Sequence, residues 1–221
     1  MIRRLSILLA FFAILMGLVY CAYSLITRIN FNSHHQVGEV IDTLNGVNIY
    51  YNGGVNTHSG RNLSIDGYNL GIQYQCVEFV KRYFYQRYQH KMPDALGHAR
   101  DFFDNKLSDG MWNEKRAMRQ YTNASQTKPM QDDLLVFSPW IFNPYGHVAI
   151  IASVTDSSIE IAQQNPGPFG PSRERLALIQ QNGLWYIDAP RVKGWLRWQA
   201  PEITASPIAE SANTPFPSKL H

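Results

Sequence analysis

The chain has 221 residues, of which 45% are hydrophobic, and its formal net charge is only +3. This length and composition predict one globular domain with a sizeable core, flanked by shorter segments. Because the sequence has no long basic run and no array of interleaved aromatic and basic residues, nucleic acid is not expected to be a partner.

An uncharged apolar stretch covers residues 5–26, after Arg3 and Arg4 and before Arg28. Its length suits a membrane-spanning helix and exceeds the core of a usual signal peptide. Basic residues before the stretch favour a cytoplasmic N-terminus, which places the following domain across the membrane. We therefore expect residues 1–28 to be an uncleaved membrane anchor, with a cleaved signal segment as the alternative, and the domain to be periplasmic or extracytoplasmic.

The first part of the soluble chain is predicted to contain a linker, a strand, a loop and two helices. Residues 29–44 are assigned to the linker, and the alternation over residues 45–54 between glycine turns is typical of a short strand. Residues 55–71 are polar and turn-rich, which indicates a loop. Apolar residues recur at helical spacing over residues 75–88, and residues 98–107 are expected to add a second helix.

The second part of the chain reads as a series of strands. Five apolar stretches are predicted to be strands: residues 134–138, 147–154, 159–165, 183–190 and 192–198. The second and third flank the turn-forming sequence TDSS and are expected to pair as a hairpin. Helices followed by strands indicate an α+β fold with an antiparallel sheet. The domain is expected to span residues 45–200, and residues 201–221, rich in Pro, Ser, Ala and Thr, are predicted to be a disordered tail.

Cys76 is the only cysteine outside the apolar N-terminal stretch, and Cys21 within that stretch cannot easily reach it. An unpaired thiol is unusual in an exported domain. Taken alone, Cys76 is more readily interpreted as a small apolar residue of the core. It also begins the predicted helix, where the partial positive charge of the helix N-terminus favours a nucleophilic thiolate that needs a nearby base.

His147 is the best-placed candidate base among the seven histidines, because it opens an apolar strand directly after the turn NPYG. The alternative is a histidine that only caps the sheet edge. Strand alternation lets Gln163 and Asn165 of the partner strand flank the imidazole, and an amide oxygen of either can accept its second N–H. A slip of the register by one residue would present Gln164 instead.

Four motifs in this order, YQCVEFVKRYF, DDLLVF, GHVAIIASV and EIAQQN, resemble the CHAP domain, a family of cysteine- and histidine-dependent amidohydrolases and peptidases. Together with the early strand and the late tryptophans they extend over roughly residues 45–198. The likeness is strongest to the amidase half of bifunctional glutathionylspermidine synthetase/amidase. It implies a papain-like CHAP fold, in which N-terminal helices pack on an antiparallel sheet, and it implies no metal or organic cofactor.

The resemblance also implies roles for individual residues. Cys76 matches the family nucleophile and His147 the general base. Gln163 stands where the family commonly has a glutamate, and Asn165 matches a family asparagine near the histidine. The third catalytic residue is therefore predicted to be Gln163, Asn165 or both.

Two further residues receive predicted roles. Gln75 is either an oxyanion-hole donor beside the Cys76 backbone N–H or a helix cap. Lys81 lies near a position at which the amidase carries a basic residue that holds a substrate carboxylate, although a lysine lacks the bidentate fork of an arginine.

The predicted function is that of a cysteine amidohydrolase or endopeptidase that cleaves a peptide or peptide-like amide through a thioester intermediate. An exported, membrane-attached domain favours peptidoglycan peptides as the substrate. The likeness to the amidase favours a glutathionyl–polyamine amide instead. A catalytically weak module that only binds wall peptides is the third alternative, because Gln163 replaces the usual glutamate.

Overall fold

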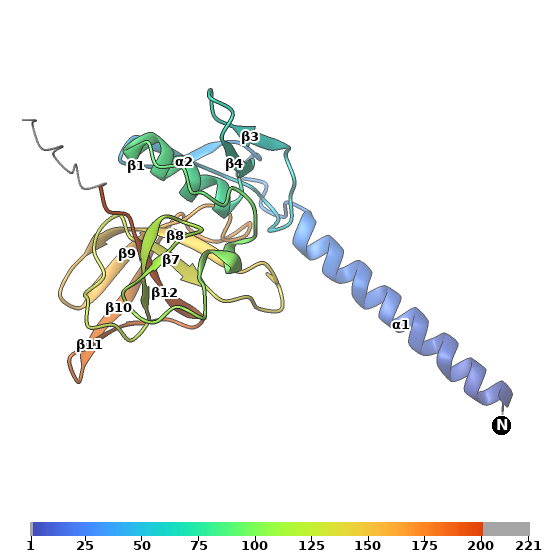
Figure 1. Cartoon of the computed structure of the whole chain (residues 1–221). Coiled ribbons are helices and arrows are strands. Elements are labelled where there is room, and N and C mark those ends of the chain that lie inside the picture. The colour runs from blue at the N-terminus through green and yellow to red at the C-terminus, as the bar shows by residue number, and fades with distance from the viewer. Residues whose placement is uncertain (1, 201–221) are drawn as a thin grey trace, which may run out of the picture.

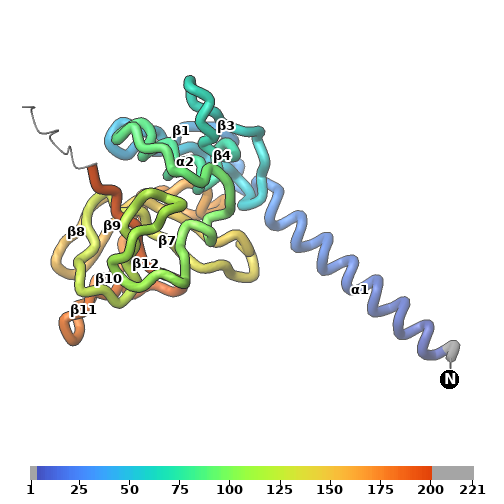
Figure 2. Tube along the Cα trace, viewed as in Figure 1, coloured from blue at the N-terminus to red at the C-terminus, as the bar shows by residue number. Residues whose placement is uncertain are grey.

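The computed structural model describes residues 2–200 of the chain. Helix α1 (Ile2–Arg28) projects from a body in which α2 (Cys76–Tyr88) covers one face of a large sheet (Figure 1). The trace in Figure 2 shows that the C-terminal end of α1 adjoins this body. The predicted α+β fold with an antiparallel sheet is confirmed. The predicted tail, residues 201–221, lies outside the described residues.

Helix α1 is long and apolar enough to cross a membrane. Its segment Arg4–Arg28 has a mean hydropathy of 2.5, and the most apolar part of this segment is not buried against the rest of the described chain. At a rise of about 1.5 Å per residue, a helix of this length exceeds the roughly 30 Å of hydrocarbon in a bilayer. A membrane span and a signal sequence both meet these criteria. The structure therefore confirms a helix of sufficient length and apolar character, whereas the membrane anchor and the side of the membrane on which the domain lies stay predictions.

Eight antiparallel strands form the main sheet, in the order β11-β10-β9-β8-β7-β12-β6-β5. The strands are β5 (Met111–Asn113), β6 (Met118–Thr122), β7 (Leu134–Phe137), β8 (His147–Val154), β9 (Ser158–Ala162), β10 (Arg173–Gln181), β11 (Leu184–Asp188) and β12 (Val192–Arg197). Two smaller hairpins pair β1 (Val40–Leu44) with β2 (Val47–Tyr50) and β3 (Arg61–Leu63) with β4 (Asn69–Ile72). β8 lies between β7 and β9, which places its first residue at one end of a buried strand.

Alternation along β8 separates two hydrophobic cores. Val148 and Ile150 point to the face covered by α2, where they share a core with Phe79 and its helical neighbours. Ala149 and Ile151 point to the opposite face and belong to the second core. Because apolar side chains recur on one side of α2 at helical spacing, the helix buries that side and leaves its other side to solvent or polar partners.

Most predicted strands are confirmed. β8 has the predicted bounds, and β9 pairs with it as the predicted hairpin. β9 ends at Ala162, three residues earlier than expected, and Asn165 takes a left-handed conformation with φ 61°. β10 was not predicted, because it is rich in charged and polar residues whose side chains remain exposed while its backbone pairs with β9 and β11.

The prediction of a second helix over residues 98–107 is wrong. Only a 3₁₀ turn, η1 (Ala99–Phe102), forms there. Polar side chains bind the backbone groups that a longer helix would need: Asp101 accepts the His98 N–H at 2.7 Å, and Asp104 accepts the Lys106 N–H at 2.9 Å. Such local hydrogen bonds compete with helix formation.

The prediction of a loop over residues 55–71 is also wrong in part, because it contains β3 and the beginning of β4. These strands are too short and polar to show a two-residue period. Gly71 in β4 has φ 130° and lies directly against α2, where a Cβ atom would come within 3.3 Å of the Glu78 Cα. β1 occupies the end of the segment assigned to the linker, residues 29–44, and pairs with β2.

Candidate active site

Cys76 is the first residue of α2, as the sequence predicted. The preceding Gln75 is extended, with φ −82° and ψ 157°, so the first N–H groups of the helix face the region of the thiol. Burial raises the pKa of the Cys76 thiol to about 11, and hydrogen bonds from the backbone N–H groups of Val148, Val77 and Cys76 act in the opposite direction. Val148 directly follows His147, so the thiol lies beside the start of β8.

His147 begins β8, and its Nε2 atom is 2.9 Å from Oε1 of Gln163. An amide oxygen only accepts, so Nε2 carries the proton and Nδ1 is left as the free acceptor. Burial lowers the pKa of His147 to about 4, with an opposing contribution from the hydrogen bond to Gln163 and a further lowering from the charge of Arg191. The imidazole is therefore neutral near pH 7.

Gln163 is fixed in this orientation by its other hydrogen bonds. Its Nε2 donates to the carbonyl of Pro171 at 3.1 Å and to the Glu174 carboxylate at 3.3 Å. Both partners are acceptors, so a flipped amide would lose these bonds together with the bond to His147. Glu174 belongs to the unpredicted strand β10, which explains why sequence reasoning missed it.

Asn165 lines the same cavity as His147, but within the described residues it makes no hydrogen bond to the imidazole. Its Nδ2 donates to the Val55 carbonyl at 2.9 Å and to Oε1 of Gln75 at 2.7 Å. Its Oδ1 atom is buried without a hydrogen-bond partner within residues 2–200. Of the two amides that the sequence left open, the structure thus brings Gln163 into hydrogen-bonding distance of the imidazole.

Gln75 occupies the N-cap position, but its side chain makes no capping hydrogen bond. Its Nε2 donates instead to the carbonyls of Val55 at 3.2 Å and Thr57 at 2.7 Å. Both amide protons are therefore engaged with the loop that follows β2. An oxyanion-hole role for Gln75 remains a prediction, and it would require these bonds to rearrange.

Lys81 is a buried residue of α2 and lines neither of the two cavities described below. Its ammonium donates to the carbonyls of Asn69 and Ala95, the latter at 2.9 Å, and lies over the Tyr68 ring. Burial lowers its pKa to about 8, and the nearby charge of Arg116 acts in the same direction. Since these backbone carbonyls engage the ammonium, the predicted contact with a substrate carboxylate is not favoured by its position.

The motif residues Glu78 and Gln164 form a buried polar clamp with Arg82. The Glu78 carboxylate pairs with Nε of Arg82 at 2.5 Å and accepts from Nε2 of Gln164 at 2.9 Å. Gln164 also donates to the Gln75 carbonyl at 2.9 Å and accepts the Tyr50 N–H at 2.8 Å. The clamp therefore connects the start of α2 to the end of β9 and to β2, and it holds the two halves of the site together.

Glu78→Gln is expected to destabilise the fold by about 2 kcal/mol, because it leaves Arg82 without its charge partner and turns an amide NH₂ toward a donor. Urea unfolding followed by circular dichroism measures this loss. Gln86→Ala, an exposed change on the same helix, serves as the control and is expected to be nearly neutral. Equal unfolding midpoints for the two variants would contradict a stabilising clamp.

Two cavities meet at the site. The larger, of about 770 Å³, is lined by Cys76 and Gln75, and the smaller, of about 280 Å³, by His147 and Gln163. Val55 lines both cavities, and so does Asn143 in the loop before β8. Two arginines and two histidines line the larger cavity: Arg28, Arg61, His58 and His98.

Within the described residues, no hydrogen bond joins the Cys76 thiol to the His147 imidazole. Both groups are neutral at rest, since the thiol pKa lies well above 7 and the imidazole pKa well below it. Catalytic hydrogen bonds are often long in ligand-free enzymes and tighten when substrate binds. The geometry thus describes a resting pair and not a preformed thiolate–imidazolium pair.

Alkylation of Cys76 by iodoacetamide is therefore expected to be slow at pH 7 and to accelerate as the pH rises toward the thiol pKa of about 11. The thiolate is the reactive form, and burial disfavours it. Mass spectrometry of labelled peptides over a pH series measures the rate, and His147→Ala should change it little at pH 7. Rapid labelling at pH 7 that disappears in His147→Ala would instead demonstrate a preformed ion pair.

A family model of the CHAP domain matches residues 66–165. Trypanothione synthetase from Crithidia fasciculata is 30% identical over 132 residues, which is 58% of this chain and 20% of that protein. Bifunctional glutathionylspermidine synthetase/amidase from Escherichia coli (strain K12) is 29% identical over 143 residues, which is 60% of this chain and 23% of that protein. The chain thus spans about a fifth of the length of the curated relatives it matches.

Among solved structures, the crystal structure of Ly7917 aligns with 44% of this chain and 40% of its own, at 19% identity and a TM-score of 0.25. A score this low is no support for a shared fold. All four motifs lie within residues 66–165, the segment that the family model matches. Residues 66–165 of the chain thus match the CHAP domain family, and Cys76, His147 and Gln163 all lie within this matched segment.

Proposed function

We propose that the chain is a cysteine amidohydrolase in which Cys76 is the nucleophile, His147 the general base and Gln163 the residue that orients the imidazole. The hydrogen bond from His147 Nε2 to Gln163 Oε1, at 2.9 Å, carries the proposal. This bond leaves Nδ1 of His147 unprotonated. The next residue of β8, Val148, donates its backbone N–H to the Cys76 thiol. A cysteine at a helix N-terminus, a base and an orienting amide are the parts that thiol-dependent acyl transfer requires.

The reaction begins when the amide carbonyl enters beside Cys76. His147 Nδ1 takes the thiol proton as the sulfur bonds to the carbonyl carbon, and the backbone N–H groups at the start of α2 stabilise the oxyanion. Collapse of the tetrahedral intermediate breaks the C–N bond, and His147 returns the proton to the leaving amine. Water, deprotonated by His147, then attacks the thioester, and the carboxylic acid and the free thiol are released.

The two cavities suggest which part of the substrate lies where. The larger cavity lies on the Cys76 side and suits the acyl part, and its basic side chains, including Arg61 and His58, favour an acyl group that carries a carboxylate. The smaller cavity lies on the His147 side and suits the leaving amine, with Glu174 in its wall. A basic amine leaving group fits that carboxylate.

Two substrate classes meet this description. Peptides of a cell wall carry carboxylates on the acyl side and are reached by an exported, membrane-attached domain, which is the orientation that the basic N-terminal residues predict. Conjugates of the glutathionylspermidine type carry a carboxylate-bearing acyl group and a basic polyamine, and they are named in the relatives that this chain resembles. The shared feature is an amide between an anionic acyl group and an amine.

Product analysis tests the proposal. The detergent-solubilised chain is incubated separately with purified peptidoglycan and with glutathionylspermidine, and the products are identified by mass spectrometry. We expect one of the two to yield a new free amine and a new free carboxylate. If the chain retains peptidoglycan in a pull-down but releases no product from either compound, the module is a binding protein and the enzymatic proposal is wrong.

A further inference from the structure

The segment that follows α1 is docked on the domain through many contacts. Thr27 is buried, and its carbonyl accepts the Asn56 N–H at 2.8 Å. Gly54 lies so close to the end of the helix that a Cβ atom there would come within 2.7 Å of the Thr27 oxygen. The last turn of α1 is therefore packed into the domain.

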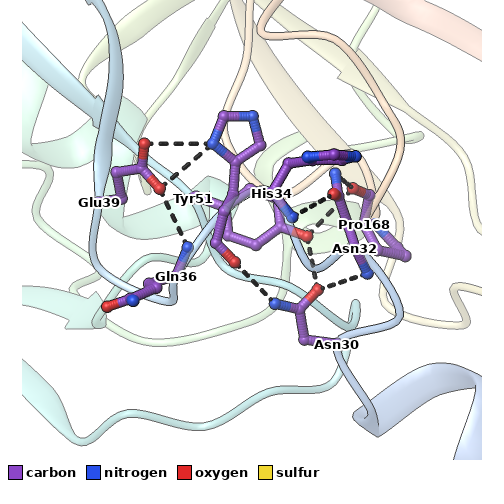
Figure 3. A network of polar contacts seen from close by, with 8 residues as sticks. Asn30, Asn32, His34, Gln36, Glu39, Tyr51 and Pro168 are labelled. Carbon is purple, nitrogen blue, oxygen red and sulfur yellow. Dashed lines mark hydrogen bonds and ion pairs between the residues drawn. The ribbon is translucent and has the colours of Figure 1, made fainter.

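A network of asparagine side chains extends this attachment (Figure 3). Asn30 donates to the His35 carbonyl at 3.0 Å and accepts from the Tyr51 hydroxyl at 2.7 Å and the Asn32 N–H at 3.0 Å. Asn32 in turn donates to the Pro168 carbonyl at 2.9 Å, far away in the sequence. These bonds fix the direction in which α1 leaves the domain, and with it the face of the domain that would lie toward a bilayer.

The larger cavity lies at the end of the apolar helix. The uncharged stretch ends at Ile26, and Arg28, two residues later, lines the cavity. In a spanning helix the first basic residue after the apolar stretch lies at the level of the lipid headgroups. One wall of the cavity would therefore lie within about one helical turn of the hydrocarbon boundary.

The loop between β7 and β8 supplies an exposed apolar surface next to the same cavity. Its side chains are exposed to 46% at Trp140, 76% at Ile141, 41% at Phe142 and 44% at Tyr145. Tyr145 lines the larger cavity and Trp140 the smaller. Figure 1 shows the yellow loop on the side of the domain from which α1 departs.

The apolar loop is held in a defined shape. The backbones of Trp140 and Asn143 exchange two hydrogen bonds of 3.0 Å, and Arg100 donates from its backbone to the Tyr145 carbonyl at 2.9 Å and from its side chain to the Pro144 carbonyl at 3.1 Å. Arg191 lies 5.2 Å from the centre of the Trp140 ring. The exposed side chains are therefore presented by a fixed loop with two guanidinium groups beside it.

We propose that α1 spans a bilayer and that the loop of residues 139–145 inserts its apolar side chains into the surface of that same bilayer, so that the larger cavity opens at the membrane surface. Tryptophan and tyrosine prefer this interface, and Arg100 and Arg191 match anionic headgroups. Exposed large apolar side chains that lie side by side are typical of an interaction surface. The bilayer is the occupant because the loop and Arg28 border one cavity, and α1 is fixed to the domain.

The consequence for the substrate depends on the proposed function. An amidohydrolase whose cavity opens at the membrane surface acts on amides held at that surface. Lipid-coupled amides are then better substrates than the same amides in solution. The membrane contact itself does not depend on catalysis, so the two are tested separately.

Tryptophan quenching tests the membrane contact directly. The full chain is reconstituted in phospholipid nanodiscs whose acyl chains are either plain or brominated, and the fluorescence of its five tryptophans is compared. We expect brominated lipid to quench part of the emission, and the quenched part to be absent in Trp140→Phe. Trp185→Phe in β11, away from the loop, is the matched control and should retain it. Circular dichroism confirms that each variant is folded.

Equal quenching in the wild-type chain and in Trp140→Phe would overturn the proposal, and would leave the patch as a docking surface for protein. In a second assay, the amide cleaved in the product analysis is supplied free in solution or coupled to a phospholipid. Ile141→Ser/Phe142→Ser is expected to lower turnover of the coupled form several-fold and to leave turnover of the free form unchanged. Absence of turnover by the wild-type chain would refute the proposed function while the quenching result stands.

Discussion

Cys76→Ala is expected to reduce amide hydrolysis to the background rate, a loss of at least about 10⁴-fold. In the proposed mechanism the Cys76 thiol forms the covalent intermediate, and without it the N–H groups at the start of α2 have no thiol-derived oxyanion to stabilise. The measurement is product formation by mass spectrometry on whichever amide the wild-type chain cleaves. Turnover that survives the substitution would eliminate Cys76 as the nucleophile.

The same substitution should leave the fold intact. Cys76 is buried and neutral at rest, so removal of its sulfur costs only about 1 kcal/mol for the small cavity that remains. Thermal unfolding followed by circular dichroism checks this expectation. Cys21→Ala is the matched control, since Cys21 is the other free cysteine and is exposed on α1. It should change neither hydrolysis nor the unfolding of the domain.

The parts of the fold that follow a clear periodicity were predictable from the sequence. The apolar run from His147 to Val154 and the helical spacing after Cys76 gave elements with nearly the observed bounds. The missed elements, β3 and β10 among them, are polar strands whose stability comes from backbone pairing with distant neighbours. Local residue patterns do not contain that information.

The residues proposed for the site were chosen from the sequence, whereas most of their contacts could not be predicted from it. Strand alternation correctly placed Gln163 on the face of His147, because the register pairs Ile151 with Ile161. It did not indicate that Asn165 leaves the strand with a positive φ and turns to Gln75. A single left-handed residue ends the alternation on which such reasoning depends.

Glu78 shows a second limit. The sequence assigned no contact to it, whereas the structure buries it with Arg82 and Gln164. Its charge partner lies one helical turn away, a spacing at which ion pairs are common. What could not be read from the sequence is the third partner, Gln164, which makes the pair a link between helix and sheet.

Gln163→Ala is expected to lower kcat/KM by about 100- to 1,000-fold, because His147 then loses the acceptor that fixes its ring and its tautomer. Asn165→Ala removes an amide of similar burial that makes no hydrogen bond to His147, and it should cost clearly less. Steady-state kinetics on the two variants decide which amide orients the base. A larger loss in Asn165→Ala would assign the role to Asn165.

Gln163→Glu provides a second test. If Gln163 had only a structural role, this substitution should leave the pH profile of kcat/KM unchanged. A carboxylate beside Nε2 stabilises the imidazolium, so the pKa of His147 should rise from about 4, and the base should be lost at a higher pH as the solution is acidified. The acid limb of the kcat/KM profile should therefore shift upward by at least about one pH unit. Activity at pH 5 then falls relative to activity at pH 8.

Glu174 determines how far this shift goes. In Gln163→Glu the new carboxylate faces Glu174 and the Pro171 carbonyl, which now accept from the Gln163 amide. Two acceptors in these positions disfavour its ionisation and limit its effect on His147. Gln163→Glu/Glu174→Gln supplies a donor in place of one acceptor, so the double variant should show the larger shift of the acid limb. Identical profiles for the wild type and both variants would mean that Gln163 does not act on His147 during catalysis.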